Sequence, residues 1–375
     1  MTEHFGFDRF FHVGGAEPLL GHHYPTSVIT NDGVSEISIN AEIAERVEGR
    51  DREGREFSFR DLERYHDWEK GAYMDDLSTD AACRFIREKA EKPFFLYLSF
   101  HAPHTWYNSP SIGSYAHKKW DPLSKGYVAM IERLDSHVGM VLDALGEAGI
   151  DENTVVFFTS DNGGVCRDGR EGEERIHWID FRERMKVNRD LRKGKHYHFE
   201  GGIRVPMIVR WPAKIRPKGE NDLPWYFADA FPTLAEIGRA TDIVPDDVDG
   251  SSVLPTLMGM DQPELQNRPL FWEAHKFFGF YQVVRKGDWK LIRWTRQGPR
   301  LHPLGDVDPI LPDSHYPLLE LFNLREDHRE EHNLAEPESP RTNELISLLD
   351  SEEAHTEDAE WPLTDAERRV FGNTL

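Results

Sequence analysis

The sequence predicts an α/β protein with a mixed, mostly parallel sheet sandwiched by helices, followed by a small C-terminal α+β domain built on an antiparallel sheet. Two patterns carry this prediction. Between residues 78 and 237, short apolar runs alternate with segments of helical periodicity, as strands and helices alternate around a parallel sheet. From Arg268 onward, two β-rich runs around a Gly-containing turn replace that alternation. We therefore predict domains at residues 1–267 and 268–375.

The N-terminal part offers few secondary-structure signals. Residues 1–60 are rich in Gly, His, Asp and Glu without apolar periodicity, so we expect mostly loop, with a short helix near residues 41–46. The first clear helix is predicted over residues 78–90, where Ser78 or Thr79 can cap the N-terminus and apolar residues recur on one face.

The central part alternates between strand and helix patterns. Apolar and β-branched runs predict strands over residues 94–100, 154–159 and 205–211, and the first two read as fully buried. Helical spacing of apolar residues predicts helices over residues 124–148 and 228–237. A strand, helix, strand order of this kind favours parallel pairing with helices covering the sheet.

The C-terminal part contains the clearest hairpin. Tyr281–Arg285 and Trp289–Arg293 are β-rich, and Lys286-Gly287-Asp288 separates them with turn residues. We expect these two runs to pair antiparallel and to form the core of the C-terminal domain.

The composition excludes several classes of function. A formal net charge of −22 argues against general binding to the phosphate backbone of nucleic acids. No apolar stretch is long enough to span a membrane, and Met1–Gly6 contains no apolar signal-peptide core. Cys83 and Cys166 are too few for a disulfide framework, so free thiols are the default.

The most informative segment is the run Thr154–Gly164. Its apolar residues end on Asp161, Asn162 and two glycines, at the carboxyl end of a predicted strand, where open α/β sheets bind ligands. Carboxylate and amide oxygens are hard ligands suited to Ca²⁺ or Mg²⁺. Asp-Asn-Gly-Gly is also good turn chemistry, so a plain turn is an equal alternative for this segment alone.

Two more polar clusters follow or flank predicted core strands. His101 and His104 follow the strand over residues 94–100, and Lys193 and Lys195 precede the strand over residues 205–211. Placed at one sheet edge with Asp161 and Asn162, they would set a cation site beside a positively charged anion pocket. That arrangement suits a sulfate or phosphate ester, because cationic groups stabilise charge on its oxygens.

Four segments, in this order, resemble the type I sulfatases of the alkaline phosphatase superfamily. They look like the family's strand ending in Pro-His, its metal-binding strand end, its Gly-Lys…Glu-Gly-Gly-Xaa-Arg-Xaa-Pro segment and the closing motif of its C-terminal domain. In this sequence they stand at Pro93–His104, Ser160–Gly164, Gly194–Pro206 and Glu320–Ala335. The resemblance covers nearly the whole chain and implies an alkaline phosphatase-like fold.

The resemblance also implies roles for individual residues. Asp161 and Asn162 would be calcium ligands, with Mg²⁺ the less favoured ion. Lys195 would contact the sulfate and the ester oxygen, and His104 would hold the sulfate or assist the leaving group. Glu200 and Arg204 would orient the backbone rather than touch the substrate. Simpler alternatives are that Lys195 is a solvated loop residue and His104 a turn residue.

The sequence departs from the family at the nucleophile. The family uses a Cys or Ser in a Cys/Ser-Xaa-Pro-Xaa-Arg segment, converted to formylglycine, and no such segment occurs here. Cys83 reads as a small core residue on a helix, and Cys166 has Arg170 at the right offset but lacks the Pro. Asp75-Asp76 imitates the family's Asp-Asp pair, but we predict a loop there. We expect the N-terminal segment with the nucleophile to be absent, and this chain to be inactive alone.

Several functions therefore stay open. The first is a calcium-dependent sulfatase whose nucleophile comes from a complementing N-terminal polypeptide or an unread upstream segment. The second is a non-catalytic remnant or binding module, and the third a phosphodiesterase or phosphonate hydrolase of the same superfamily. The resemblance implies a sulfated small molecule or sulfated glycan as substrate. The cellular location stays undetermined, although the family is often exported or periplasmic.

Overall fold

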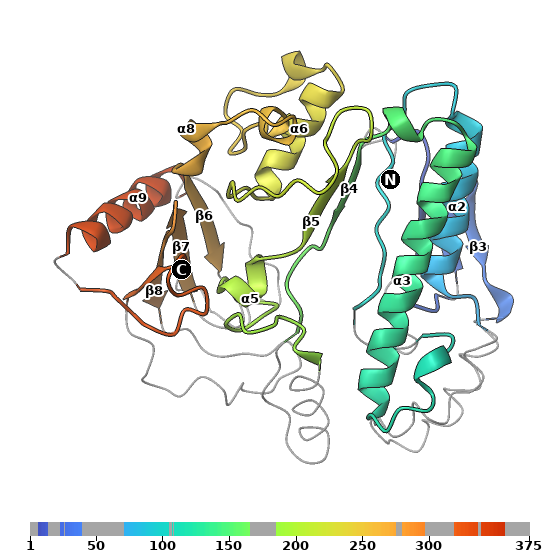
Figure 1. Ribbon diagram of the computed structural model, residues 1–375, viewed down its shortest axis with the longest axis horizontal. Coiled ribbons are helices and arrows are strands. Elements are labelled where there is room, and N and C mark those ends of the chain that lie inside the picture. Colours follow the sequence, from blue (N-terminus) through green and yellow to red (C-terminus); the bar gives the residue numbers. More distant parts are fainter. Residues whose placement is uncertain are drawn as a thin grey trace, which may run out of the picture. The chain divides into compact units, whose positions relative to one another are not determined.

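The computed structural model describes residues 7–13, 23–25, 27–39, 71–104, 107, 109–165, 185–274, 280–296, 319–336 and 339–356 (Figure 1). The chain divides into two compact units. The first comprises Met1–Phe157, Arg170–Val187 and Val209–Pro217, and the second comprises Phe158–Gly169, Asn188–Ile208 and Lys218–Leu375. The domain boundary predicted between residues 267 and 268 stays a prediction.

Two long helices form the core of the first unit. Helix α2 (Met74–Lys89) packs against helix α3 (Pro122–Glu147). Asp121 caps α3, since its Oδ1 accepts a hydrogen bond from the Ser124 N–H at 2.9 Å. The buried residues between the helices are Cys83, Ile86, Ala144 and Leu145.

Helix α2 begins earlier than the sequence predicted. The prediction of a helix over residues 78–90 capped by Ser78 or Thr79, after a loop at Asp75-Asp76, was wrong at its start. Asp75 and Asp76 instead lie in the first helical turn, and Thr79 Oγ1 donates to the Asp75 carbonyl at 2.6 Å. Carboxylates are favourable there, because the exposed N–H groups give a helix N-terminus partial positive charge.

The N-terminal part contains strands where loop was expected. β1 (Phe11–Val13), β2 (Ser27–Thr30) and β3 (Gly33–Glu36) form a small antiparallel sheet. β2 and β3 pair Thr30 with Gly33, so their connection is a two-residue turn. The short helix predicted near residues 41–46 lies outside the described residues.

The segment over residues 94–100 does not form a strand in the described structure, contrary to the prediction. Its residues nevertheless alternate between partly buried and exposed, as those of a strand would. Phe94 and Leu96 pack on the core between α2 and α3, while Phe95 and Tyr97 are 57% and 72% exposed. Without a paired neighbour among the described residues, this apolar run lacks the ladder hydrogen bonds that define a strand.

Two other predicted strands are present and pair with each other. β4 (Val156–Thr159) lies next to β5 (Met207–Arg210) in a two-stranded sheet. All four residues of β4 are only partly buried, so the expectation of a fully buried strand was wrong. The short helix α5 (Glu200–Ile203) lies between β4 and β5 along the chain. Other short helices follow β5: η6 (Phe227–Asp229), α6 (Ala230–Ile237), η7 (Thr241–Ile243), α7 (Leu254–Leu257) and α8 (Pro263–Gln266). Two further 3-10 turns lie in the first unit, η4 (Gly113–Tyr115) and η5 (Asp151–Asn153).

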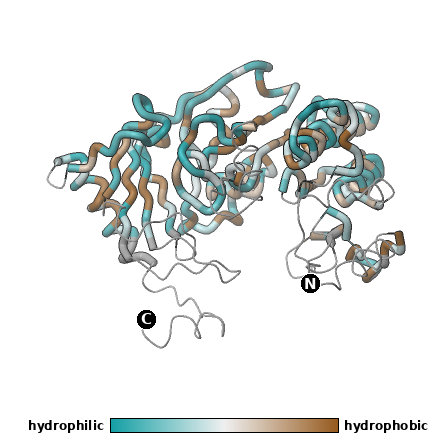
Figure 2. Tube along the Cα trace, turned by 90° about the horizontal axis from the view of Figure 1, so that it is seen from below, coloured by the Kyte–Doolittle hydropathy of each residue, from teal (hydrophilic) through white to brown (hydrophobic). Residues whose placement is uncertain are grey.

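The second unit is built on a four-stranded antiparallel sheet, as predicted for the C-terminal part. Its strands, in spatial order, are β6 (Pro269–Ala274), β7 (Phe280–Lys286), β8 (Trp289–Arg296) and β9 (Leu319–Asn323). The predicted hairpin is β7 and β8, which close on Gly287 at φ 59°. Figure 2 shows hydrophobic stretches along these strands.

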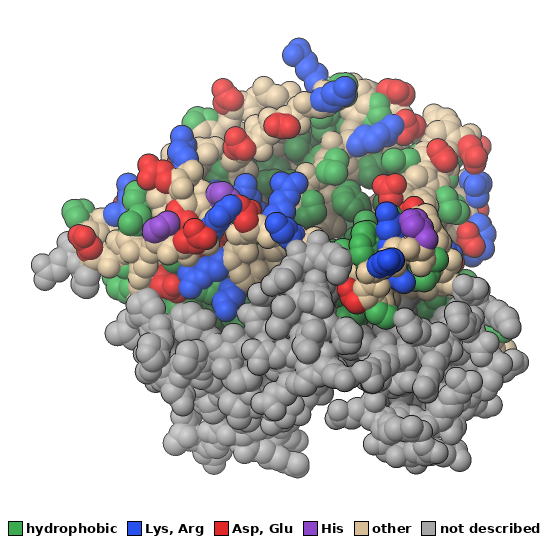
Figure 3. All heavy atoms as spheres, turned by 60° about the horizontal axis from the view of Figure 1, so that its bottom comes forward, with side chains coloured by type: hydrophobic (Ala, Val, Ile, Leu, Met, Phe, Trp, Pro, Cys, Tyr) green, Lys and Arg blue, Asp and Glu red, His purple; other side chains and the backbone are tan. Residues whose placement is uncertain are grey.

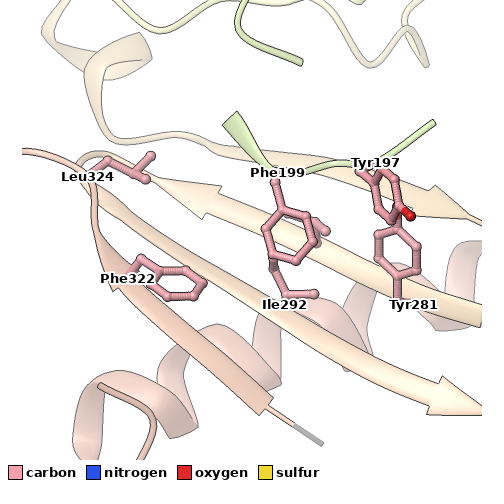
Figure 4. Close-up of a cluster of buried hydrophobic side chains, with 7 residues drawn as sticks. Tyr197, Phe199, Tyr281, Ile292, Phe322 and Leu324 are labelled. Atoms are coloured by element: carbon pink, nitrogen blue, oxygen red, sulfur yellow. The ribbon is translucent and has the colours of Figure 1, made fainter. Parts of the chain in front are cut away.

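Both faces of this sheet are covered. Helix α9 (Pro340–Thr356) packs Leu345 and Leu349 on one face. On the other face, Tyr197 and Phe199 point from the segment before α5 onto the strands, as Figure 4 shows. The sheet residues that they meet are Tyr281, Val283, Ile292 and Phe322, joined at the sheet end by Leu324. The segment over residues 188–203 is therefore anchored to the C-terminal sheet.

Two further sequence expectations concern thiols and membranes. Cys83 is a buried free thiol in the helical core, as predicted, and Cys166 lies outside the described residues. In the part of the chain that the structure describes, no helix combines the length and apolar character needed to cross a membrane.

Candidate functional site

The turn after β4 contains Asp161, which is exposed, and Asn162, which is partly buried. Asp161 Oδ1 accepts a hydrogen bond from the Asn162 N–H at 2.9 Å, and Asn162 Nδ2 donates to the Gly163 carbonyl at 3.0 Å. Ser160 Oγ donates to the Asn162 carbonyl at 3.0 Å. These bonds fix the turn and leave Asp161 Oδ2 and Asn162 Oδ1 without a donor among the described residues. Both atoms are of the type that binds hard divalent cations.

Glycines bring this turn into direct contact with α5. The Gly163 N–H donates to the Gly202 carbonyl at 2.8 Å. A Cβ atom at Gly163 would lie 1.8 Å from the Gly201 carbonyl oxygen, and one at Gly202 would lie 1.8 Å from the Tyr197 carbonyl oxygen. Any other residue would force these segments apart, so the glycines are needed for close approach rather than for flexibility.

Lys195 is held beside the same turn. Its N–H donates to the Gly164 carbonyl at 3.0 Å, and its side chain is partly buried. Its neighbours Lys193 and His196 have φ angles of 58° and 79°, which non-glycine residues rarely adopt. No carboxylate lies within ion-pair distance of Lys195 among the described residues. The loop therefore fixes the Lys195 backbone, and no carboxylate that the structure describes neutralises the Lys195 ammonium group.

Asn188 joins the two segments, which no sequence motif predicted. Its Oδ1 accepts from the Gly164 N–H at 2.7 Å, and its Nδ2 donates to the Gly164 carbonyl at 2.9 Å and the Lys193 carbonyl at 2.9 Å. An asparagine in a charged loop is ordinary, and its partners lie 24 and 5 residues away. Sequence spacing alone does not reveal such contacts.

A buried ion network holds α5 against the C-terminal sheet. Lys290 Nζ lies 3.0 Å from Glu200 Oε1 and 2.8 Å from Glu330 Oε1, and all three residues are at most 2% exposed. The Glu200 N–H also donates to Glu330 Oε2 at 2.7 Å. The Glu200 carboxylate thus pairs with a side chain of the sheet, and its predicted role in orienting the backbone stays a prediction. Arg204 Nη1 lies 4.0 Å from Glu200 Oε2 on a largely exposed side chain, so it contributes little to that pairing.

His104 belongs to the first unit, where the chain after residue 100 makes a tight turn through a cis Ala102–Pro103 bond. The His104 N–H donates to the His101 carbonyl at 2.8 Å, and the His104 carbonyl lies 2.9 Å from His23 Nε2. Burial lowers the pKa of His23 to about 4, so its ring is neutral at pH 7. The His104 residue itself is exposed.

Asp75 supports this turn from α2. Its fully buried carboxylate accepts the His101 N–H at 2.8 Å and the Ala102 N–H at 2.9 Å. Burial alone would raise the pKa of Asp75, but these bonds and the nearby His101 ring outweigh it and lower the pKa. The neighbouring Asp76 pairs with Arg133 and lies 2.7 Å from His137 Nε2.

The predicted site residues thus fall into two groups. Asp161, Asn162 and Lys195 are brought together in the second unit by main-chain hydrogen bonds between their loops. His104 stands in the first unit with its own support. Sequence reasoning missed Asn188, and it dismissed Asp75 as part of a loop.

The donor set at Asp161 and Asn162 fits a divalent cation in chemistry, though not in number. Ca²⁺ takes about six to eight oxygen ligands, and these two residues offer two or three. A second group, Asp327, Glu331 and His332, also has its ligand atoms within 4.8 Å of one another. There the Asp327 carboxylate already accepts the N–H groups of Glu331 and His332 at 3.1 and 2.8 Å, so a turn explains it.

The family models and the relatives that match this chain all point to the same protein family. The family model described as Sulfatase matches residues 1–239, and that described as N-sulphoglucosamine sulphohydrolase, C-terminal, matches residues 193–306. Steryl-sulfatase of Mus musculus is 32% identical over 292 residues, covering 72% of this chain and 43% of that protein. A sulfatase of Formosa agariphila is 33% identical over 307 residues, covering 74% and 49%.

A solved structure shares the fold of this chain. The crystal structure of Ps i-CgsB matches with a TM-score of 0.67 at 21% identity, covering 98% of this chain and 70% of that one. At this identity the match shows a shared fold. The chain spans about half the length of the two relatives named above.

Proposed function

The chain belongs to the sulfatase family and has its alkaline phosphatase-like α/β fold, and from this premise we propose that it forms part of a calcium-assisted hydrolase of sulfate esters. One observation carries the proposal. The turn with Asp161 and Asn162 and the loop with Lys195 are bonded to each other through Gly164. Hard oxygen ligands and an ammonium group without a carboxylate partner among the described residues therefore stand on adjoining loops, as a sulfate ester beside a cation requires.

Each residue has a distinct role in the proposed reaction. Asp161 and Asn162 would hold the cation, and Ca²⁺ is favoured over Mg²⁺ because it tolerates irregular oxygen sets. A bound cation supplies positive charge toward the nonbridging oxygens of the sulfate. The Lys195 ammonium stabilises negative charge on the sulfate and the ester oxygen. His104 holds the sulfate or gives a proton to the leaving oxygen.

The nucleophile is proposed to come from outside these 375 residues. The sequence contains no Cys/Ser-Xaa-Pro-Xaa-Arg segment for a formylglycine, and the Cys83 thiol is buried between helices. Burial also raises the pKa of Cys83, which disfavours the reactive thiolate. We therefore expect this polypeptide alone to bind calcium weakly and not to turn over sulfate esters. A complementing N-terminal polypeptide would restore turnover.

The substrate class remains a sulfated small molecule or a sulfated glycan. The two matches differ on this point, since one relative is a steryl-sulfatase and one family model describes a sulphoglucosamine sulphohydrolase.

The lack of a formylglycine segment in the sequence favours a second candidate function, a non-catalytic binding module that uses the same cation and anion site.

A calorimetric titration of the full chain with Ca²⁺ tests the cation site. We expect a dissociation constant on the order of 10⁻⁴–10⁻³ M, because the ligand set is incomplete. Asp161→Ala should weaken binding at least about tenfold, since it removes the charged ligand. The matched control is Asp247→Ala, an exposed carboxylate elsewhere in the second unit. Equal binding by the two variants would refute the site.

Turnover and anion binding separate the two candidate functions. Sulfate binding should fall in Lys195→Ala and persist in Lys214→Ala, whose lysine is exposed in the first unit. Hydrolysis of an aryl sulfate should be undetectable for the chain alone. Micromolar calcium binding together with turnover would contradict the expected inactivity, and failure of an added N-terminal polypeptide to restore turnover would favour the binding module.

A further inference from the structure

We propose that Asn188 is a positioning residue that sets the Asp161–Asn162 turn and the Lys195 loop in register, so that cation and anion binding depend on its side-chain amide. The inference rests on the proposed function and deepens it. Its evidence is a juxtaposition: one amide bonds the main chain of both loops, at Gly164 and at Lys193.

The Asn188 amide behaves like a neighbouring strand toward Gly164. It accepts from the Gly164 N–H at 2.7 Å and donates to the Gly164 carbonyl at 2.9 Å. The same carbonyl accepts the Lys195 N–H at 3.0 Å. Gly164 is therefore held from both sides, and it stands two residues after Asn162.

The second hydrogen of the amide reaches the loop that carries Lys195. Nδ2 donates to the Lys193 carbonyl at 2.9 Å, while the Lys193 backbone has a positive φ of 58°. A non-glycine residue persists in that conformation only when its surroundings fix it. The Asn188 bond is one such constraint, and it acts two residues before Lys195.

Asn188 itself is anchored by its own turn. Its carbonyl accepts the Leu191 N–H at 3.0 Å. The side-chain oxygen of Asn188 accepts one hydrogen bond, and its two N–H groups donate one each. An isosteric change of donors to acceptors would thus place oxygen against two carbonyl oxygens.

Three measurements on the full chain test the proposal: Ca²⁺ titration, inorganic sulfate titration and hydrogen exchange of residues 158–165 and 190–196. Asn188→Ala should lower the affinities for Ca²⁺ and for sulfate about 10- to 100-fold, because loss of a group that supports metal ligands typically has an effect of this size. It should also speed exchange at Gly164 and Lys195 while leaving β7 and β8 protected.

Asn188→Asp separates the hydrogen bonds from the space that the side chain fills. This variant keeps the volume and the acceptor but loses both donors, so we expect it to bind no better than Asn188→Ala. If it binds as the wild type does, the amide donors are unnecessary and the proposal is wrong.

Two controls identify a purely structural effect. Asn221→Ala removes a local bond to the Leu223 N–H in the same unit and should leave both affinities unchanged. Leu345→Ala removes a fully buried side chain of α9 and should lower the melting temperature without changing either affinity.

The outcomes distinguish this inference from the proposed function. If the wild type binds neither Ca²⁺ nor sulfate, the proposed function fails, and the inference fails with it. If the wild type binds and the Asn188 variants bind equally well, only the inference fails. If both Asn188 variants are unfolded at room temperature, Asn188 is a folding element, and the positioning role is refuted.

Discussion

At the residue scale, two polar side chains in this protein, the buried Asp75 and the partly buried Asn188, hold main chain in place near residues of the proposed site. Asp75 accepts hydrogen bonds from two consecutive N–H groups of the turn that leads to His104, and Asn188 accepts a hydrogen bond from the Gly164 N–H. Both side chains bond backbone that is distant in sequence. The residues expected to touch the substrate, His104 and Lys195, are by contrast at least partly exposed.

Asp75→Asn should destabilise the first unit by about 1–3 kcal/mol, because the amide can accept only one of the two N–H groups and leaves a buried donor unpaired. Denaturant unfolding at pH 7 measures this difference. Asp80→Asn, at an exposed position on the same helix, is the control.

The pH dependence of that difference has a definite sign. The pKa of Asp75 is lowered in the folded state, so its contribution is present above its ordinary pKa of 3.8 and is lost as the pH falls through the lower folded value. The gap between wild type and Asp75→Asn should therefore close under strongly acidic conditions. A gap that persists unchanged there would contradict the role given to the carboxylate.

At the element scale, local signals predicted some elements well and others poorly. The β7–β8 hairpin follows from β-rich runs around Gly287, and α3 follows from apolar residues at helical spacing. The start of α2 was missed because the partners of Asp75, at residues 101 and 102, lie far along the chain. The run over residues 94–100 has strand-like composition, but ladder bonds require a partner that composition does not specify.

The ion network at α5 gives an element-scale prediction. Glu330 shares Lys290 with Glu200, and burial, followed by the repulsion from Glu200, raises the pKa of Glu330 despite the attraction of Lys290. A raised carboxyl pKa means that Glu330 stabilises the fold at low pH and loses that contribution as the pH rises through the folded pKa. We expect Glu330→Gln to destabilise the fold by about 1–3 kcal/mol, because the amide can accept from only one of its two donors, Lys290 Nζ and the Glu200 N–H, and we expect this loss to be smaller at pH 7 than at pH 4.

The opposite change should be severe. Lys290→Met leaves two buried carboxylates without their cation and should cost about 3–5 kcal/mol in unfolding free energy at pH 7. Thermal or urea unfolding of the two variants side by side checks this. A mild effect of Lys290→Met, equal to that of Glu330→Gln, would show that the network does not anchor α5.

At the scale of the whole molecule, the acidic composition and the site are separate matters. On the face drawn in Figure 3, Lys, Arg, Asp and Glu side chains are interspersed.

Sequence motifs identified Asp161, Asn162, Lys195 and His104, because a family resemblance identifies residues by the order of their motifs along the chain. They did not identify Asn188, because its hydrogen bond to Gly164 is a contact across 24 residues that only the folded chain creates.

The predicted boundary between residues 267 and 268 gives the last prediction, because the segment over residues 188–203 is packed on the C-terminal sheet. A chain ending at residue 267 keeps Asp161, Asn162 and Lys195. It removes the sheet residues under Tyr197 and Phe199, which are 6% and 0% exposed, and it removes Lys290 from Glu200.

Exposing each of those aromatic side chains costs about 1.5–3 kcal/mol, so we expect the shortened chain to lose order over residues 188–203. Calcium and sulfate binding should then weaken at least about tenfold, measured by the same titrations. Hydrogen exchange over α2 and α3 is the internal control and should stay slow, because their shared core lies within residues 83–156. Full affinity in the shortened chain would instead show that residues 1–267 form an independent domain and that the C-terminal sheet does not position Lys195.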